Sequence, residues 1–295
     1  MTGTVTRLAP YVTLIRAANP GPMTLDGTNT WILGDPDQNA PLVVDPGPLI
    51  AEHLELIMGQ ARGRISGIVL THRHLDHSES AAALAARAEC RVRAADPDLR
   101  LGAAGLDAED RIEVPGAVLE VVETPGHTSD SRSLLIIGDD GVTRLLTGDM
   151  VLGRGTTVIM HPDGNLGAYL DSLQVMQALV AERGVSELLP GHGPVVADPA
   201  GWLAFYREHR MDRLDQVRAA LAAGDHTPDE VVARVYADVD RSVWPAASLS
   251  VRAQLSYLAD LSEPGAQQRG EGMTTQAVQT DRTAWSQTRE PLSKT

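Results

Sequence analysis

Short runs of apolar and β-branched residues recur along the first part of the chain, and the first three are bounded by Gly, Pro or Asp. Such runs are typical of β-strands, and the intervening stretches carry apolar residues at helical spacing. The alternation predicts sheets covered by helices. Strands are expected at Tyr11–Ile15, Thr30–Leu33, Leu42–Val44, Ile65–Leu70, Arg91–Ala94, Val118–Val122, Leu134–Ile137, Leu145–Leu146 and Leu188–Leu189.

Three segments differ in composition. Residues 1–198 contain all of these strands, and residues 199–263 are expected to be helical. Residues 264–295 are rich in Gln, Thr, Arg, Gly and Ser, so they cannot bury enough apolar surface to offset their ordering entropy and are expected to be disordered. The helices are expected at Pro48–Ala61, Ser80–Cys90, Leu166–Arg183, Trp202–Ala222, Pro228–Tyr236 and Ala246–Leu261.

Composition narrows the possible classes of protein. The 295 residues are 43% hydrophobic and carry a net charge of −14, and an acidic surface repels nucleic-acid backbones and anionic membranes. The single cysteine, Cys90, excludes an internal disulfide and a Cys-rich zinc site. Neither an export signal nor a membrane-spanning run is visible, so we expect a soluble, cytoplasmic protein without membrane partners.

The chemically informative stretch is Thr71–His77 (THRHLDH), which directly follows the most compact apolar run. A loop after a buried strand is a common place for chemistry in sheet proteins. Residues two apart in an extended loop point the same way, so His72 and His74 can share one cation. Asp76 and His77 can then turn toward a second cation.

Three further polar residues each follow another apolar run, beside a Gly that permits a tight turn. They are His127, Asp149 and His192. Five imidazoles and two carboxylates suit two metal ions per chain, and nitrogen and oxygen ligands favour Zn²⁺, with Mn²⁺ or Fe²⁺ as alternatives. A water between two such ions loses a proton near neutral pH, and the resulting metal-bound hydroxide suits hydrolysis. Solvated loop residues are the competing interpretation, and the repeated local context disfavours it.

The order of these residues resembles that of the metallo-β-lactamase superfamily, over roughly residues 10–198. The resemblance implies an α+β fold, an αββα sandwich of two mixed sheets, with 1–198 as the catalytic domain. It also implies a ligand set: His72, His74 and His127 for the first metal, Asp76, His77 and His192 for the second, and Asp149 as the bridge. Asp76 is in addition the candidate catalytic residue, able to take or give a proton.

A narrower similarity is to the beta-lactamase-like protein 2 group, through residues 19–30 (NPGPMTLDGTNT) and 148–159 (GDMVLGRGTTVI). In that group the chain continues into a small winged-helix-like domain, which 199–263 would form here. Residues 227–230 (TPDE) are typical of a capping box at a helix start. No wing is expected, because the last predicted helix runs directly into the polar tail.

The superfamily cleaves β-lactams, thioesters and phosphodiesters, so the resemblance leaves the substrate open. We favour a compact ester or thioester, either a small molecule or a carrier-bound acyl group. Cleavage of single-stranded RNA is the alternative, disfavoured by the acidic charge and by an aromatic content of only 3%. A non-catalytic metal-binding module is a third possibility, disfavoured by the complete ligand set. The terminal helices are expected to form a lid or a homodimer contact.

Candidate substrate contacts lie in the motifs that carry the resemblance and near them. For each, a structural role in a turn or on a helix face is the alternative interpretation. They are Thr28, Asn29, Arg154, Thr156, Thr157, His161 and Tyr169.

Overall fold

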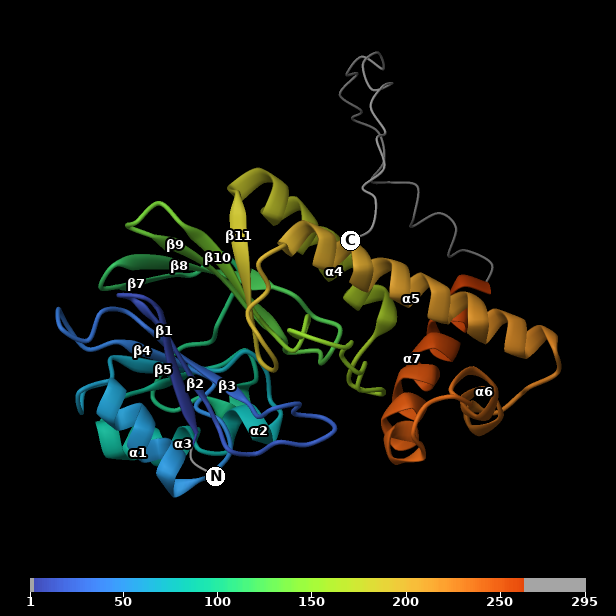
Figure 1. The fold of residues 1–295 in the computed structure, drawn as a ribbon, viewed down its shortest axis with the longest axis horizontal. Coiled ribbons are helices and arrows are strands. Elements are labelled where there is room, and N and C mark those ends of the chain that lie inside the picture. Colours follow the sequence, from blue (N-terminus) through green and yellow to red (C-terminus); the bar gives the residue numbers. More distant parts are fainter. Residues whose placement is uncertain (1–2, 263–295) are drawn as a thin grey trace, which may run out of the picture. The chain divides into compact units, whose positions relative to one another are not determined.

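The computed structural model describes residues 3–262, so the tail expected to be disordered, 264–295, lies outside the described residues. Two β-sheets face each other, and helices lie on their outer faces (Figure 1). The first sheet has the order β1 (Thr4–Ala9), β2 (Val12–Arg16), β3 (Asn29–Leu33), β4 (Leu42–Val44), β5 (Gly67–Val69) and β6 (Val92–Arg93). The second has the order β11 (Val185–Pro190), β10 (Thr143–Gly148), β9 (Arg132–Gly138), β8 (Ala117–Glu123) and β7 (Arg111–Val114).

Both sheets are mixed. In the first, β4, β5 and β6 run parallel and the other pairs antiparallel. In the second, β10 and β11 run parallel, and β8 shares their direction because β9 lies antiparallel between β8 and β10. The carboxyl-terminal ends of β8, β10 and β11 therefore lie on the same side of the second sheet, where the strands end.

The alternation of side chains along the strands divides the core into two layers. In β3, Trp31 and Leu33 point between the sheets, where they join Leu119 of β8 and Leu134 of β9. Ile32, between them in the sequence, points to the outer face. There it belongs to the layer that packs under the helices α1 (Ala51–Gln60) and α3 (Ala81–Ala88). The αββα sandwich expected from the resemblance is confirmed.

Within residues 3–262, four α-helices come after β10 in the chain: α4 (Leu166–Arg183), α5 (Pro199–Ala222), α6 (Pro228–Val235) and α7 (Trp244–Ser262). The first two, α4 and α5, contact β11 of the second sheet (Figure 1). The expected capping box is present at α6, where the Thr227 hydroxyl accepts from the Glu230 backbone and the Glu230 carboxylate accepts from the Thr227 backbone. No strand follows α6 in the described residues, and the segment after Leu261, where a wing was not expected, lies almost wholly outside them.

The compact unit that contains the sandwich extends to Tyr257, and the residues from Leu258 onward are assigned to a second unit. The boundary expected after residue 198 stays a prediction. None of the described helices combines the length and the apolar character needed to cross a membrane.

Two strands were not expected from the sequence. β1 is exposed along most of its length, and β7 buries only its last residue. Both are edge strands, so neither shows the compact apolar run that marks a buried strand. The run Ile65–Leu70 contains the shorter strand β5, and the residues after it enter the loop that leads to α2 (Leu75–Ser78).

The core position of Leu119 gives a stability prediction. Leu119 is fully buried between the sheets, so Leu119→Ala leaves a cavity and should lower the free energy of unfolding by about 2–5 kcal/mol. Urea unfolding followed by circular dichroism measures this change. The control is Val175→Ala on the exposed side of α4, which should cost less than about 1 kcal/mol. Equal losses in the two variants would contradict the assignment of the core.

Candidate metal centre

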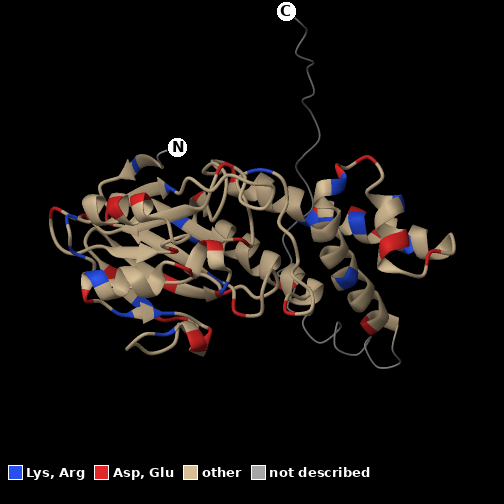
Figure 2. Ribbon diagram, turned by 90° about the horizontal axis from the view of Figure 1, so that it is seen from below, with Lys and Arg blue, Asp and Glu red and all other residues tan. Residues whose placement is uncertain are grey.

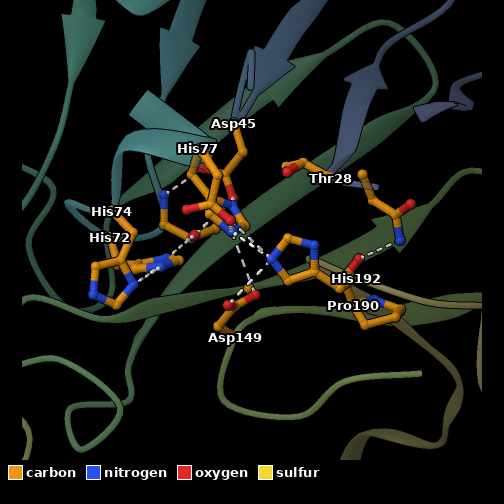
Figure 3. A network of polar contacts seen from close by, with 12 residues as sticks. Thr28, Asp45, His72, His74, His77, Asp149, Pro190 and His192 are labelled. Atoms are coloured by element: carbon orange, nitrogen blue, oxygen red, sulfur yellow. Dashed lines mark hydrogen bonds and ion pairs between the residues drawn. The ribbon is translucent and has the colours of Figure 1, made fainter. Parts of the chain in front are cut away.

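The seven side chains singled out by the sequence meet where strands of both sheets end. Figure 3 shows His72, His74, His77, Asp149 and His192 pointing toward one another. His72 and His74 lie in the loop after β5, and Asp76 and His77 lie in the short helix α2 that follows. The other three come from the second sheet, in the loops after β8, β10 and β11. They are His127, Asp149 and His192.

Three imidazoles form a first group. His74 Nδ1 lies 2.9 Å from His72 Nε2 and 3.0 Å from His127 Nε2. Unprotonated ring nitrogens at this separation repel each other unless a proton or a cation lies among them. His72 and His127 are buried and His74 is partly exposed, so the group is open on one side.

Asp76, His77 and His192 form a second group. His192 Nε2 lies 3.2 Å from both His77 Nε2 and Asp76 Oδ2. The Asp149 carboxylate reaches both groups. Its Oδ1 lies 3.4 Å from His77 Nε2, and its Oδ2 lies 3.4 Å from His192 Nε2 and 3.8 Å from His127 Nε2. Asp149 is thus placed to touch ions bound in either group.

Four of the five imidazoles use Nδ1 for a protein partner on the side away from the cluster. The pairs are His72 with the Thr71 hydroxyl (3.0 Å), His77 with Asp45 (2.9 Å), His127 with the Val158 carbonyl (2.6 Å) and His192 with the Gly27 carbonyl (3.2 Å). Carbonyl and carboxylate oxygens only accept, so Nδ1 of His77, His127 and His192 carries a proton and Nε2 of each ring faces the cluster. Outer partners of this kind hold metal-ligating histidines in one tautomer and orientation.

Asp45 is the functional residue that the sequence analysis missed. It is fully buried, and its carboxylate accepts from the Thr71 backbone N–H (2.8 Å), the Thr71 hydroxyl (2.7 Å) and His77 Nδ1. The sequence held a signal, because Asp45 follows the run Leu42–Val44 and precedes Pro and Gly, much as the selected ligands follow theirs. All its partners lie on the outer side of the ligands, so Asp45 orients the loop and His77.

Burial and charge give the groups different protonation states. Burial lowers the pKa of His127 to about 4, so this ring is neutral at pH 7. Burial also opposes charge on His192 and Asp149. At His192, the Asp149 charge and the hydrogen bonds with Asp149 and Asp76 outweigh burial and raise the pKa to about 9. At Asp149, His192 and His77 hold the pKa of the carboxyl well below its usual range.

This charge distribution suits divalent cations. In the metal-free chain, protons on His77 and His192 balance the Asp149 carboxylate, and cations bound there would take the place of those protons. In addition, Asp149 Oδ1 is buried without a hydrogen-bond partner among the described residues. A buried carboxylate oxygen without a donor is costly. The donor set therefore fits metal ions, with imidazoles and carboxylates as ligands.

The backbone of the His192 loop lies against these ligands. A Cβ atom added to Gly191 would lie 2.4 Å from Asp149 Oδ1 and 2.8 Å from His77 Cε1. Gly148, before Asp149, has a φ of +49°, and a Cβ there would lie 2.8 Å from the Thr71 hydroxyl. Glycine at both positions lets three loops close around one small volume.

Thr28 and Asn29, two of the expected substrate contacts, brace the same loop. Both are buried. The Asn29 side-chain amide donates to the carbonyls of Pro190 and Gly193, both at 2.9 Å, and Thr28 forms a β-bridge with His192. These contacts fix the position of His192.

Thr156 and Thr157 border a cavity beside the centre. The Thr157 hydroxyl lies 3.2 Å from His127 Nδ1, and the Thr156 hydroxyl lies 3.4 Å from His209 Nε2. His161 is half-buried, and no hydrogen bond or ion pair among the described residues joins its side chain to the cluster.

Arg154 and Tyr169 have other partners. Arg154 is exposed and forms a bidentate ion pair with Asp26. Its Nη1 and Nη2 donate to the two carboxylate oxygens at 2.7 and 2.9 Å. Tyr169 is fully buried, and its hydroxyl donates to the Met150 carbonyl at 2.7 Å. The structure does not bring the Tyr169 side chain to an accessible surface, because it packs in the interior below the loops.

Comparison with known proteins places this geometry in a family. Residues 23–192 match the metallo-beta-lactamase superfamily, and residues 227–261 match the beta-lactamase associated winged helix domain. The chain belongs to the metallo-β-lactamase superfamily. The expectation of an enzyme, a hydrolase of this superfamily, is confirmed.

Individual relatives cover most of the chain. It is 32% identical over 278 residues to a beta-lactamase-like protein 2 homolog of Drosophila melanogaster, and the match covers 86% of this chain and 89% of that protein. It is 30% identical over 253 residues to an atrochrysone carboxyl ACP thioesterase of Aspergillus chevalieri, covering 81% and 77%. The crystal structure of a beta-lactamase domain protein from Burkholderia ambifaria shares the fold, with a TM-score of 0.72 at 23% identity over 88% of this chain and 90% of that one.

The contacts of Asp45 give a prediction about metal binding. Asp45→Asn keeps the shape of the side chain but removes the charge that holds His77 Nδ1, so zinc affinity should fall by about 10–100-fold. Competition with a chromophoric chelator measures the affinity, and thermal unfolding of the metal-free variant shows whether the fold is retained.

The matched control is Asp139→Asn, which removes an exposed carboxylate and should leave zinc affinity unchanged. An Asp45→Asn protein that is folded and binds zinc as tightly as the native chain would show that Asp45 does not orient a ligand.

Proposed function

We propose that the seven side chains bind two divalent metal ions and that the enzyme hydrolyses a compact ester or thioester. The observation that carries the proposal is the buried carboxylate of Asp149, which lies between two inward-facing groups of ligands. Zn²⁺ is the ion that this donor set favours, with Mn²⁺ or Fe²⁺ as alternatives. The first ion would bind to His72, His74 and His127, the second to Asp76, His77 and His192, and Asp149 would bridge them.

Bound metal ions in such a site lower the pKa of water and polarise a carbonyl group. The chain itself supplies orientation and proton transfer. Asp76 has a partly exposed side chain, and its Oδ2 lies 3.2 Å from His192 Nε2. In the proposed reaction, Asp76 accepts the proton released by the attacking water and returns it to the leaving thiolate or alkoxide, so that an acid and a thiol or alcohol are formed.

Two observations support an acyl substrate. A relative that is 30% identical over most of its length is named as an acyl-carrier thioesterase. The net charge of −14 disfavours a long nucleic-acid strand, and Figure 2 shows basic and acidic residues interspersed along the described chain. Single-stranded RNA remains a substrate to be tested.

The test combines metal content with a parallel substrate screen. The purified chain should bind two equivalents of zinc, lose activity on chelation and recover it on adding zinc back. His72→Ala and Asp149→Ala should each lower activity by about a hundredfold or more, because even outer partners of metal ligands cost 10–100-fold. The screen compares a thioester, an ester, a phosphodiester and single-stranded RNA.

The control variant is His226→Ala, which removes an exposed imidazole outside the cluster and should not change turnover. Unchanged activity in His72→Ala, or RNA cleavage that exceeds thioester hydrolysis at physiological salt, would overturn the proposal.

A further inference from the structure

A second polar site lies beside the metal centre, in a cavity of about 260 Å³. Its wall on the sandwich side is formed by residues 22–23 and 156–158. Its other walls come from α5, from the segment between α6 and α7, and from the start of α7. One side is apolar, with Val239, Val243 and Ala247. The other side carries two arginines of α5, Arg210 and Arg213.

Arg210 is buried to all but 4% of its surface, and no ion pair neutralises it among the described residues. Its Nη2 donates to the Thr157 carbonyl at 2.6 Å, and its guanidinium carbon lies 4.9 Å from the centre of the Tyr169 ring. Its Nε is buried and has no acceptor among the described residues. A buried guanidinium with no counter-charge is unfavourable, so an anion in the adjoining cavity would stabilise it.

The surroundings reinforce the positive charge. Arg213 borders the same cavity, stacks on Tyr236 at 4.7 Å and donates to neutral oxygens of Gln216 and Val235. His209 lines the cavity too, and burial together with the charges of Arg210 and Arg213 lowers its pKa to about 4. None of the described residues that line the cavity is acidic, although the whole chain has a net charge of −14.

The cavity and the metal centre share a wall. Thr157 accepts from Arg210 through its carbonyl, and its hydroxyl lies 3.2 Å from His127 Nδ1. The Val158 carbonyl accepts from the same imidazole at 2.6 Å, and Val158 also lines the cavity. A group held by Arg210 would thus be separated from His127 of the metal centre by Thr157 and Val158.

We propose that this cavity binds an anionic group of the substrate, a carboxylate or a phosphate, through Arg210 and Arg213. The inference rests on the proposed function and narrows its substrate class to an ester or thioester that carries a negative charge beside an apolar portion. A carboxylate would belong to the acyl group itself, and a phosphate would belong to a carrier arm of the phosphopantetheine type.

The first experiment needs no catalysis. The full chain is treated with chelator and titrated calorimetrically with succinate and with inorganic phosphate. At least one of these anions should bind, and Arg210→Met should weaken that binding by about tenfold or abolish it, since a charge-assisted hydrogen bond is lost. Arg213→Gln should weaken it several-fold, and this variant tests the site even if Arg210→Met fails to fold.

The matched control is Arg218→Gln, which removes the same charge from the exposed face of the same helix and should leave anion binding unchanged. The proposal is overturned if neither anion binds to the native chain, or if a folded Arg213→Gln variant binds as tightly as the native chain.

The second experiment identifies the source of the anion with the zinc-loaded enzyme. A carboxylate site predicts a higher kcat/KM for the succinyl than for the butyryl thioester of N-acetylcysteamine. A carrier-phosphate site predicts a higher kcat/KM for butyryl phosphopantetheine than for butyryl pantetheine.

If all the thioesters are inert while anion binding persists and depends on Arg213, the proposed hydrolysis fails and the anion site stands. Equal rates within both pairs would overturn the role of the cavity in substrate recognition.

Discussion

The carboxylate of Asp149 is the charge around which the site is organised. It is buried beneath loops of both sheets, and one of its oxygens has no hydrogen-bond donor among the described residues. Such a group is stable only when positive charge is held close to it. The surrounding imidazoles supply this charge through protons, and the same nitrogens are placed to supply it through metal ions instead. The need to neutralise this one carboxylate thus accounts for the convergence of ligands from the ends of four strands.

The fold meets this need through backbone groups as much as through side chains. Carbonyls of Gly27 and Val158 hold His192 and His127 from outside, and Asp45 does the same for His77. These acceptors belong to loops that connect core strands or follow them, so the ligand positions depend on the packing of the sandwich. Because the loops are also closed by glycines at 148 and 191, little space remains for the ligands to rearrange.

The sequence predicted the parts of the fold whose residues repeat a local signal. Compact apolar runs predicted the central strands. The polar residues after such runs predicted the cluster, four of them in the stretch Thr71–His77 and three beside a glycine. β1 and β7 were missed because edge strands bury few side chains. The roles of Asn29 and Tyr169 could not be read from the sequence, since a buried amide bracing a distant loop and a buried phenol bonded to the Met150 carbonyl are set by tertiary contacts. Asp45 carried the local signal but stood apart from the motif.

The two-residue wall of Thr157 and Val158 has a consequence for how this enzyme can change over time. Both residues support His127 on one side and border the arginine-lined cavity on the other. Thermodynamic linkage would make the effect of an anion in the cavity on metal affinity equal to the effect of the metal on anion affinity. Given the proposed roles of the two sites, remodelling the cavity for a new substrate would also change metal affinity, so selectivity and metal retention would not be independent traits.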